Sequence, residues 1–205
     1  MSSGTRAACG LVLASLFAAS TAMGQGARVR FGVGGSLTVP LGDFHADASG
    51  DGFKAGWQGL ALVDVQPRTS PVGFRLDFSF GENSSNDQLN ADLTAAVGAP
   101  TTAKIKLLGG TADVAYHFKP STGGLAGYML GGLGLYNVKL AVTSQGVTAD
   151  SSETKFSWNV GAGLSFAVGG AAVFFEARYL DVAKSFDAAK TSYVPITVGV
   201  RFGGK

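Results

Sequence analysis

The sequence has almost no cysteine. Its 205 residues include a single one, Cys9. Cys9 lies within residues 1–24, which read as a secretory signal peptide: Arg6 supplies the positive charge, Leu11–Ala19 form a short apolar core, and small residues precede a cleavage site after Gly24. An uncleaved anchor helix is the alternative interpretation of this segment. With the signal peptide removed, residues 25–205 contain no cysteine, which excludes disulfides, thiolate nucleophiles and cysteine metal sites from the mature chain.

Charge is also scarce, at 15% of residues. Loss of Arg6 with the signal peptide leaves 15 of the 16 basic residues against 14 acidic ones, so there is no basic surplus for nucleic acid. The two histidines, His45 and His117, are not accompanied by a nucleophile motif. We therefore expect no catalytic residues, no cofactor, no metal site and no nucleic-acid partner.

Long hydrophobic runs are missing after residue 26, although the mean hydropathy is high at +0.24. A membrane-spanning helix needs about 20 consecutive apolar residues, and no segment beyond the signal peptide provides them. Apolar residues must therefore be spread along the chain. This distribution is typical of strands in which large and small residues alternate.

Period-2 alternation is clearest between Lys155 and Asp181, where two runs flank Gly169 and Gly170 and predict a β-hairpin. The same pattern recurs along the whole mature chain. In total it predicts eight strands, at about 28–40, 56–66, 72–80, 105–118, 128–142, 156–168, 172–179 and 193–202. Many of these strands have the roughly 9–11 residues that a tilted strand needs to cross a bilayer.

The connections alternate between long and short. Long polar loops are predicted at 41–55, 81–102, 143–154 and 181–192, and short turns lie between them. Outer-membrane barrels have this asymmetry, with long loops outside and short turns in the periplasm. A soluble sandwich with Greek-key connections has no reason to show it.

One row of each strand carries the large residues, and its aromatics gather near the two ends. We expect this row to face lipid, with aromatics at both interfaces because their rings are amphipathic. The outer group is Trp57, Phe80, Phe156, Trp158 and Tyr179; the inner group is Phe31, Phe74, Tyr116, Phe118, Tyr128, Phe166 and Phe202. Lys104 and Lys106 interrupt the row and are interpreted as lying beyond the bilayer or after a bulge. A soluble barrel with these aromatics in its core is the alternative.

The opposite row is small and polar and contains four cations and four anions. These are Arg30, Asp64, Arg75, Asp77, Asp113, Glu176, Arg178 and Arg201. An eight-stranded barrel is only wide enough for side chains to fill it, so charges inside must pair. The pattern predicts a lumen plugged by ion pairs. A narrow channel for small solutes, lined by the same residues, is the alternative.

The sequence resembles the small eight-stranded outer-membrane β-barrel family, of the OmpA/OmpX transmembrane-domain and opacity-protein type. Four segments carry the resemblance: VRFGVGGSLTVPLGDF at 29–44, GYMLGGLGLYNV at 127–138, FFEARYLDV at 174–182 and YVPITVGVRF at 193–202. In that family a closing strand often ends in Phe, whereas here Phe202 is followed by Gly-Gly-Lys.

The fold class predicted is therefore all-β, an eight-stranded antiparallel up-and-down transmembrane barrel over residues 25–205. The resemblance implies a Gram-negative-type outer membrane, outer-membrane lipid as surroundings and the barrel-assembly machinery as a partner during insertion. We expect a monomer with a structural or surface-interaction role: envelope integrity, adhesion, or binding of an extracellular partner through the external loops. The alternatives to this role are a narrow channel, a secreted soluble barrel that binds an apolar ligand, and a lipid-modifying barrel enzyme.

Overall fold

The computed structural model describes residues 26–46, 49–118, 124–183 and 191–204. The predicted signal peptide at 1–24, with Cys9, lies outside the described residues, as does most of the predicted loop 181–192. Among the described residues, no helix is long and apolar enough to span a bilayer.

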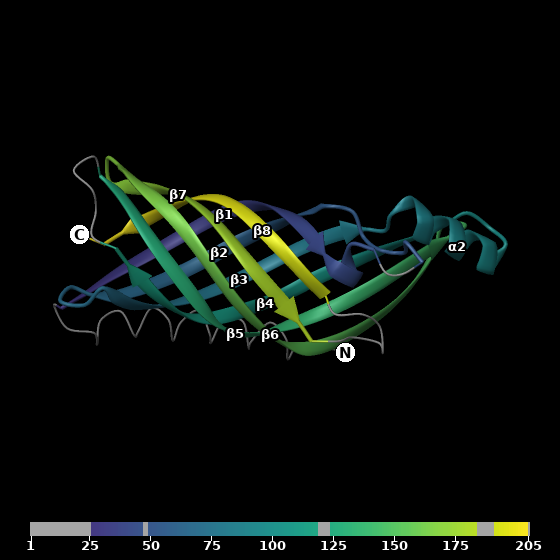
Figure 1. Ribbon diagram of the computed structural model, residues 1–205, viewed down its shortest axis with the longest axis horizontal. Helices are drawn as coiled ribbons and strands as arrows, with labels where there is room; N and C mark the ends of the chain where they lie inside the picture. Colours follow the sequence, from purple (N-terminus) through teal and green to yellow (C-terminus); the bar gives the residue numbers. More distant parts are fainter. Residues whose placement is uncertain (1–25, 47–48, 119–123, 184–190, 205) are drawn as a thin grey trace, which may run out of the picture.

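Eight antiparallel strands form one closed barrel in the order of the sequence (Figure 1). The elements are β1 (Ala27–Leu41), η1 (Gly42–Phe44), β2 (Gly56–Pro67), β3 (Val72–Ser84), α2 (Asp87–Val97), β4 (Thr101–His117), β5 (Leu125–Ser144), β6 (Val147–Val168), β7 (Ala171–Val182) and β8 (Thr191–Gly203). The predicted fold class is confirmed.

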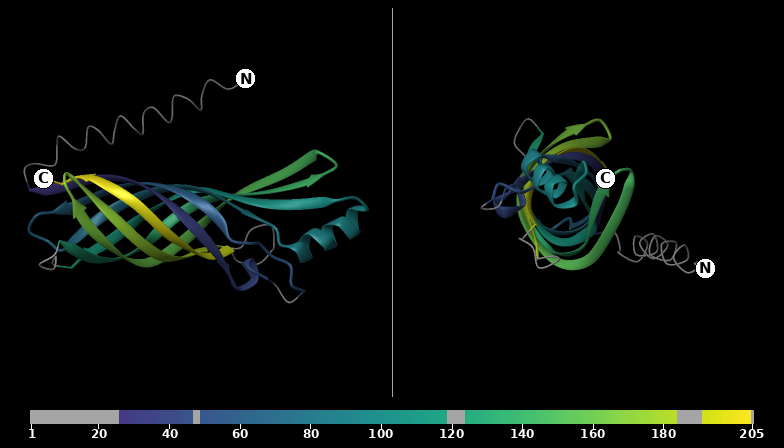
Figure 2. Two further views of the ribbon diagram at one scale, coloured as in Figure 1. Left: turned by 90° about the horizontal axis from the view of Figure 1, so that it is seen from above. Right: turned by 90° about the vertical axis from the view of Figure 1, so that its right-hand side faces the viewer.

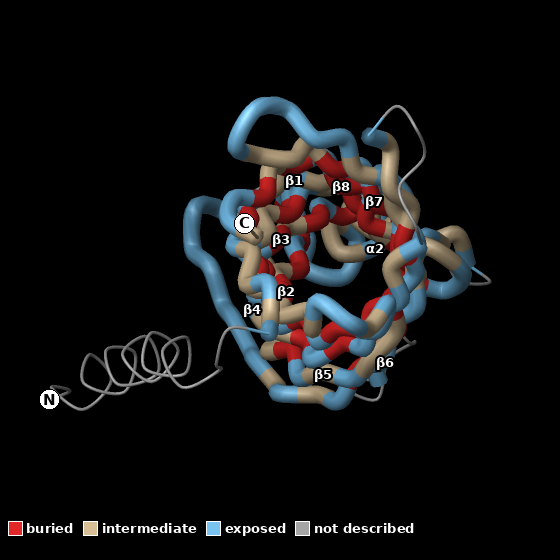
Figure 3. The backbone as a smooth tube through the Cα atoms, turned by 90° about the vertical axis from the view of Figure 1, so that its left-hand side faces the viewer, coloured by how far each residue is buried: buried red, intermediate tan, exposed pale blue. Residues whose placement is uncertain are grey.

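The barrel closes where β1 pairs with β8, from Arg30 opposite Gly203 to Leu41 opposite Ser192. Closure removes the free edges that an open sheet would expose. Figure 3 shows the ring from the end with the short turns, where β1 begins and β8 ends. Within the barrel wall, strand residues alternate between burial in the lumen and exposure on the outer surface, whereas the first six residues of β6 are all exposed.

The long hairpin of β5 and β6 extends well beyond the ends of β1 and β8, and β4 pairs with β5 up to its tip, Thr101 opposite Ser144 (Figure 2). The two strands stay in register up to Ser144 opposite Val147, so the predicted loop 143–154 is wrong. Gln145 and Gly146 form the turn, both with positive φ (49° and 79°), as in the turns whose twist matches a two-residue hairpin. The polar composition that indicated a loop instead belongs to strands that stand in water.

The predicted loop 81–102 is also largely ordered into regular structure. β3 continues to Ser84, and α2 occupies 87–97 at the same end of the barrel as the hairpin tip (Figure 2). The Asn86 side chain caps α2 by accepting a hydrogen bond from the Leu89 amide (2.9 Å), and Gly98 ends it with a positive φ of 74°. This end of the barrel is therefore a built surface with a helix and a protruding sheet.

Lys104 and Lys106 lie on the outward face of β4, and no bulge precedes them because the β3–β4 register is unbroken. Both ammonium groups approach the Glu82 carboxylate, at 2.7 and 3.5 Å. Glu82 stands one step beyond Phe80 on the outward row of β3. The cluster thus lies past the outward aromatic Phe80, which agrees with the first of the two interpretations of these lysines.

Candidate functional site in the barrel lumen

The barrel interior contains a continuous network of ion pairs. All eight charged residues of the small-residue row take part: Arg30, Asp64, Arg75, Asp77, Asp113, Glu176, Arg178 and Arg201. They come from β1, β2, β3, β4, β7 and β8, so the network crosses the lumen from wall to wall. Seven of the eight are buried; Arg30, near the short-turn end, is partly exposed.

Glycines on the lumen face of β6 make room for these long side chains. A Cβ atom at Gly161 would lie 2.6 Å from Arg178 Cγ, and one at Gly163 would lie 2.4 Å from the Tyr128 ring. These are closer than real Cβ contacts permit. The glycines of β6 therefore leave space for the large side chains that stand opposite them on the neighbouring strands, Arg178 on β7 and Tyr128 on β5.

Arg178 is the centre of the network. Its guanidinium contacts three carboxylates: Nε lies 2.6 Å from Glu176, Nη1 lies 3.1 Å from Asp113, and Nη2 contacts Asp77. Arg75 joins the same acids, with Nη1 2.6 Å from Glu176 and Nε 2.7 Å from Asp77. A buried ion pair is stable only when the remaining lone pairs and protons are also satisfied, and this shared geometry satisfies most of them.

A second group of charges connects this centre to the short-turn end. Arg201 lies 3.7 Å from Glu176 and 3.9 Å from Asp64, and Arg30 lies 3.2 Å from Asp64. The Arg201 guanidinium is also held between two aromatic rings, at 4.4 Å from the Tyr128 centroid and 4.5 Å from the Phe174 centroid. Such cation–π contacts are strongest where water is excluded.

Tyr128 is a correction to the sequence analysis, which placed it among the inner lipid-facing aromatics. It is buried in the lumen (2% exposed), and its hydroxyl donates a hydrogen bond to Glu176 (2.6 Å). In β5 the outward residues are Met129, Leu133 and Leu135. The alternation there is misleading because large residues occupy both faces, so choosing the row with aromatics selects the wrong face.

Several neutral lumen residues complete the network, and the sequence analysis did not assign them a role. Asn159 donates to Asp113 (2.7 Å), Thr111 donates to Asp113 (2.9 Å), and Phe174 packs on Arg201. Thr111 shares the lumen face of β4 with the predicted charge Asp113, two residues on, and Asn159 lies on the small-residue row of β6. That alternation is the signal that could have identified them.

Replacement of Tyr128 by Phe tests the hydroxyl without removing the ring. The ring would still pack against Arg201, but Glu176 would lose one of its buried donors. We expect the free energy of unfolding to fall by about 1.5–3 kcal/mol, the range for a hydrogen bond to a charged group. Urea-induced unfolding in lipid vesicles, followed by gel mobility, measures this. Tyr116→Phe is the matched control because Tyr116 is outward-facing (46% exposed); equal losses in both variants would contradict the assigned role.

An apolar cluster fills the lumen towards the end that carries α2. Its buried members are Phe44, Ile105, Leu107, Tyr136, Val138, Leu180, Val182 and Tyr193. Between this cluster and the ion pairs lies a cavity of about 20 Å³, lined by residues of both, including Tyr136, Leu180, Glu176 and Arg178. That volume holds about one water molecule. The described residues thus close the lumen with two layers, of which the sequence analysis predicted only the charged one.

The other predicted aromatics lie on the outer wall. Phe31, Trp57, Phe74, Phe80, Tyr116, Phe118, Phe156, Trp158, Phe166 and Phe202 are exposed, and Tyr179 is half-buried. Neighbouring members touch across strands: Trp57 and Phe80 at 5.5 Å, and Trp158 and Tyr179 at 5.3 Å between ring centroids. A wall with so many exposed rings is suited to an apolar solvent.

The two histidines lie in different parts of the barrel. His117 lies in the lumen with Nε2 3.6 Å from Asp64, whereas His45 ends η1 at the opposite end of β1. Among the described residues, no group of three or more His, Cys, Asp or Glu side chains is placed to hold a metal ion.

Comparison with known proteins decides the family. Residues 9–202 match the model of the outer membrane protein β-barrel domain family. The chain belongs to this family. It is accordingly an outer-membrane protein whose barrel crosses the bilayer, with membrane lipid around its apolar wall. In such barrels short turns face the periplasm and longer loops face outside, so α2 and the β5–β6 hairpin lie at the outer end.

Two solved structures with TM-scores above 0.5 have the same fold. Neisserial surface protein A (NspA) is 17% identical, with 87% of this chain and 97% of that chain covered and a TM-score of 0.54. A major outer membrane protein from Thermus thermophilus is 12% identical, with 86% and 98% covered and a TM-score of 0.55. Ail, the attachment invasion locus protein of Yersinia pestis, is 17% identical, with 86% and 97% covered and a TM-score of 0.45. A search of curated protein sequences found no match.

Proposed function

We propose that this outer-membrane barrel is a closed, non-enzymatic scaffold that presents an interaction surface at its outer end. The observation that carries the proposal is the filled lumen. An ion-pair network and an apolar cluster occupy it in series, with a cavity of only about 20 Å³ between them. A lumen packed in this way supports a rigid scaffold better than it supports passage of solutes.

The outer end supplies the surface. β5 and β6 have 20 and 22 residues, about twice the length needed to cross a bilayer. Between Val147 and Lys155, β6 pairs with β5, and its other edge has no strand partner among the described residues. An exposed strand edge can accept a strand from another protein through main-chain hydrogen bonds. This favours adhesion or partner binding through the hairpin as the role of the protein, with the barrel-assembly machinery acting on it only during insertion.

The experiment compares the full chain with a variant in which residues 140–151 are replaced by Asn-Gly, which removes more than half of the unpaired edge of β6. This change keeps Lys139 opposite Ser152, as in the full-length hairpin, and closes it with a two-residue turn. We expect the variant to keep its heat-dependent gel mobility and to lose attachment of cells to one another and to protein-coated surfaces. Replacement of Lys54 by Gln at the same end is the control.

Two further readouts separate the alternatives. Dye uptake by cells that lack the protein measures envelope integrity, and we expect the hairpin variant to restore the barrier as well as the full chain does. Single-channel recording of the purified barrel measures conduction, and we expect no stable open level. Unchanged attachment by the hairpin variant would refute the interaction role, and a stable conductance would favour the narrow channel.

A further inference from the structure

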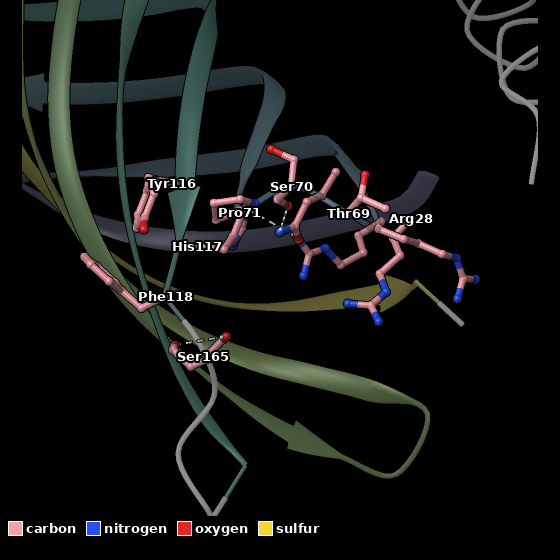
Figure 4. A pocket seen from close by; sticks show the side chains of 12 residues that line it. Arg28, Thr69, Ser70, Pro71, Tyr116, His117, Phe118 and Ser165 are labelled. Carbon is pink, nitrogen blue, oxygen red and sulfur yellow. Dashed lines mark hydrogen bonds between the residues drawn. The ribbon is translucent and has the colours of Figure 1, made fainter. Parts of the chain in front are cut away.

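The periplasmic end of the barrel contains an open cavity of about 500 Å³ (Figure 4). Its lining is cationic: it contains three arginines, and none of the twelve described lining residues carries a carboxylate. The three arginines are Arg28, Arg30 and Arg68. We call this cavity the periplasmic vestibule.

Arg28 and Arg68 lie beside each other because β1 pairs with β2 and the turn after β2 returns to β1. Arg28 lies on β1 opposite Gln66 of β2, and the turn after β2 brings Arg68 back to the start of β1, where its amide donates to the Gly26 carbonyl (2.7 Å). Gln66 holds this turn by donating to the Ser70 carbonyl (3.1 Å). The cations therefore stand on a braced turn at the rim of the barrel.

Arg30 lines the vestibule and also belongs to the lumen ion-pair network. That network does not satisfy all of its hydrogen-bond donors. Its Nη2 donates to Asp64 (3.2 Å) and to Gln66 (3.0 Å), while its buried Nε has no hydrogen-bond partner in the described part of the chain. Asp64 also faces Arg201 (3.9 Å) and His117 (3.6 Å). The Asp64 carboxylate is thus shared by Arg30 and Arg201 and does not neutralise Arg30 alone.

We infer that the periplasmic vestibule binds a phosphate group. Arginines that approach from separate backbone positions suit a tetrahedral group with several acceptor oxygens better than a planar carboxylate, which one guanidinium fork can satisfy. Thr69 and Ser70 add hydroxyls to the same lining. The cavity volume also exceeds that of a bare phosphate ion, so the group belongs to a larger molecule.

The phosphate has two chemical sources, a phospholipid headgroup or a soluble phosphate ester, and the lining favours the headgroup. Tyr116 and Phe118 line the vestibule and also belong to the outward aromatic row, with ring centroids 5.2 Å apart. The vestibule is therefore continuous with the periplasmic interface of the outer membrane, where headgroups of the periplasmic leaflet lie. An anionic phospholipid can place its phosphate among the arginines while its chains stay in the bilayer.

The test uses the folded full-length mature chain in mild detergent. Native mass spectrometry counts the adducts formed with phosphatidylglycerol and with phosphatidylcholine at equal concentration. Adducts with glycerol 1-phosphate are counted in the same way and represent a soluble phosphate ester. The test variant carries Arg28→Gln and Arg68→Gln; the matched control carries Lys54→Gln and Lys139→Gln, which remove two exposed cations from the outer end. Heat-dependent gel mobility verifies that each protein is folded.

We expect phosphatidylglycerol affinity to fall roughly 10- to 30-fold in the arginine variant, since each basic group near an anionic surface contributes on the order of fivefold. The lysine control should bind like the original chain. A different outcome is that the original chain binds glycerol 1-phosphate, that the arginine variant loses this binding, and that phosphatidylglycerol shows no preferred adducts. This outcome would support the phosphate site and would identify its ligand as a soluble ester. Equal binding by the arginine variant and the original chain, or equal loss in the lysine control, would overturn the inference.

Discussion

Replacing Arg178 by methionine is expected to lower the free energy of unfolding by about 3–5 kcal/mol. The reason is that Arg178 contacts Glu176, Asp77 and Asp113, all of them buried. Methionine fills much of the volume but leaves three carboxylates in the lumen with less compensation. Arg75 would still contact Glu176 and Asp77, whereas Asp113 would keep only neutral donors.

Urea-induced unfolding in lipid vesicles, monitored by gel mobility and tryptophan fluorescence, measures this loss. Lys139→Met is the matched control, because the Lys139–Asp150 pair is exposed on the hairpin and such pairs contribute about 0–1 kcal/mol. The double variant Arg178→Met, Asp113→Asn should lose less free energy of unfolding than the sum of the two single losses. The reason is that Asp113→Asn removes the buried negative charge that Arg178→Met leaves without a cationic partner. A loss below about 1 kcal/mol for Arg178→Met would show that the network does not stabilise the barrel.

Replacing Val160 by arginine is expected to destabilise the folded barrel in lipid by about 2–4 kcal/mol. Val160 lies on the outward face of β6 and is 48% exposed, between Trp158 and Leu164 in the same apolar row. An arginine there would place its charge in the hydrocarbon region. The cost falls towards the interfaces because the side chain can then reach water.

Val147→Arg is the matched control on the same strand. Val147 begins β6 at the hairpin tip and is 74% exposed, beyond the part of the wall that faces lipid. We expect it to change stability by about 0–1 kcal/mol. Refolding yields and unfolding midpoints in vesicles measure both variants. Equal effects at the two positions, or no effect at Val160, would contradict the assignment of this face to lipid.

Strand β5 shows where sequence reasoning fails and why. In β3 and β6 the large residues occupy one face, so period 2 identifies both the strand and its orientation. In β5, Tyr128, Leu130, Tyr136 and Val138 face the lumen while Met129, Leu133 and Leu135 face outward. Hydropathy alone does not distinguish these rows. What distinguishes them is the content of the opposite wall, where Glu176 needs the Tyr128 hydroxyl and the apolar cluster needs Tyr136 and Val138.

The outer end of the barrel shows a second limit of prediction from sequence pattern. The polar residues of 143–154 indicate a loop when judged by composition, yet they pair across a regular hairpin. Strands above the membrane have water on both faces, so the apolar row that marks a spanning strand is absent from them. The helix α2 likewise leaves only a weak pattern in the sequence, since none of its residues is buried and its periodicity is weak.

The sequence by itself determined the fold class, because strand length, period-2 alternation and the asymmetry of the connections are local properties that only a closed membrane barrel satisfies together. It also determined that eight charges share the small-residue row, because face is set by parity along each strand. Only the tertiary structure decided which charges meet, that Tyr128 joins them, and that an apolar cluster fills the rest of the lumen. Those facts depend on the stagger of eight strands around the barrel, and stagger brings together side chains more than 100 residues apart, such as Arg75 and Glu176.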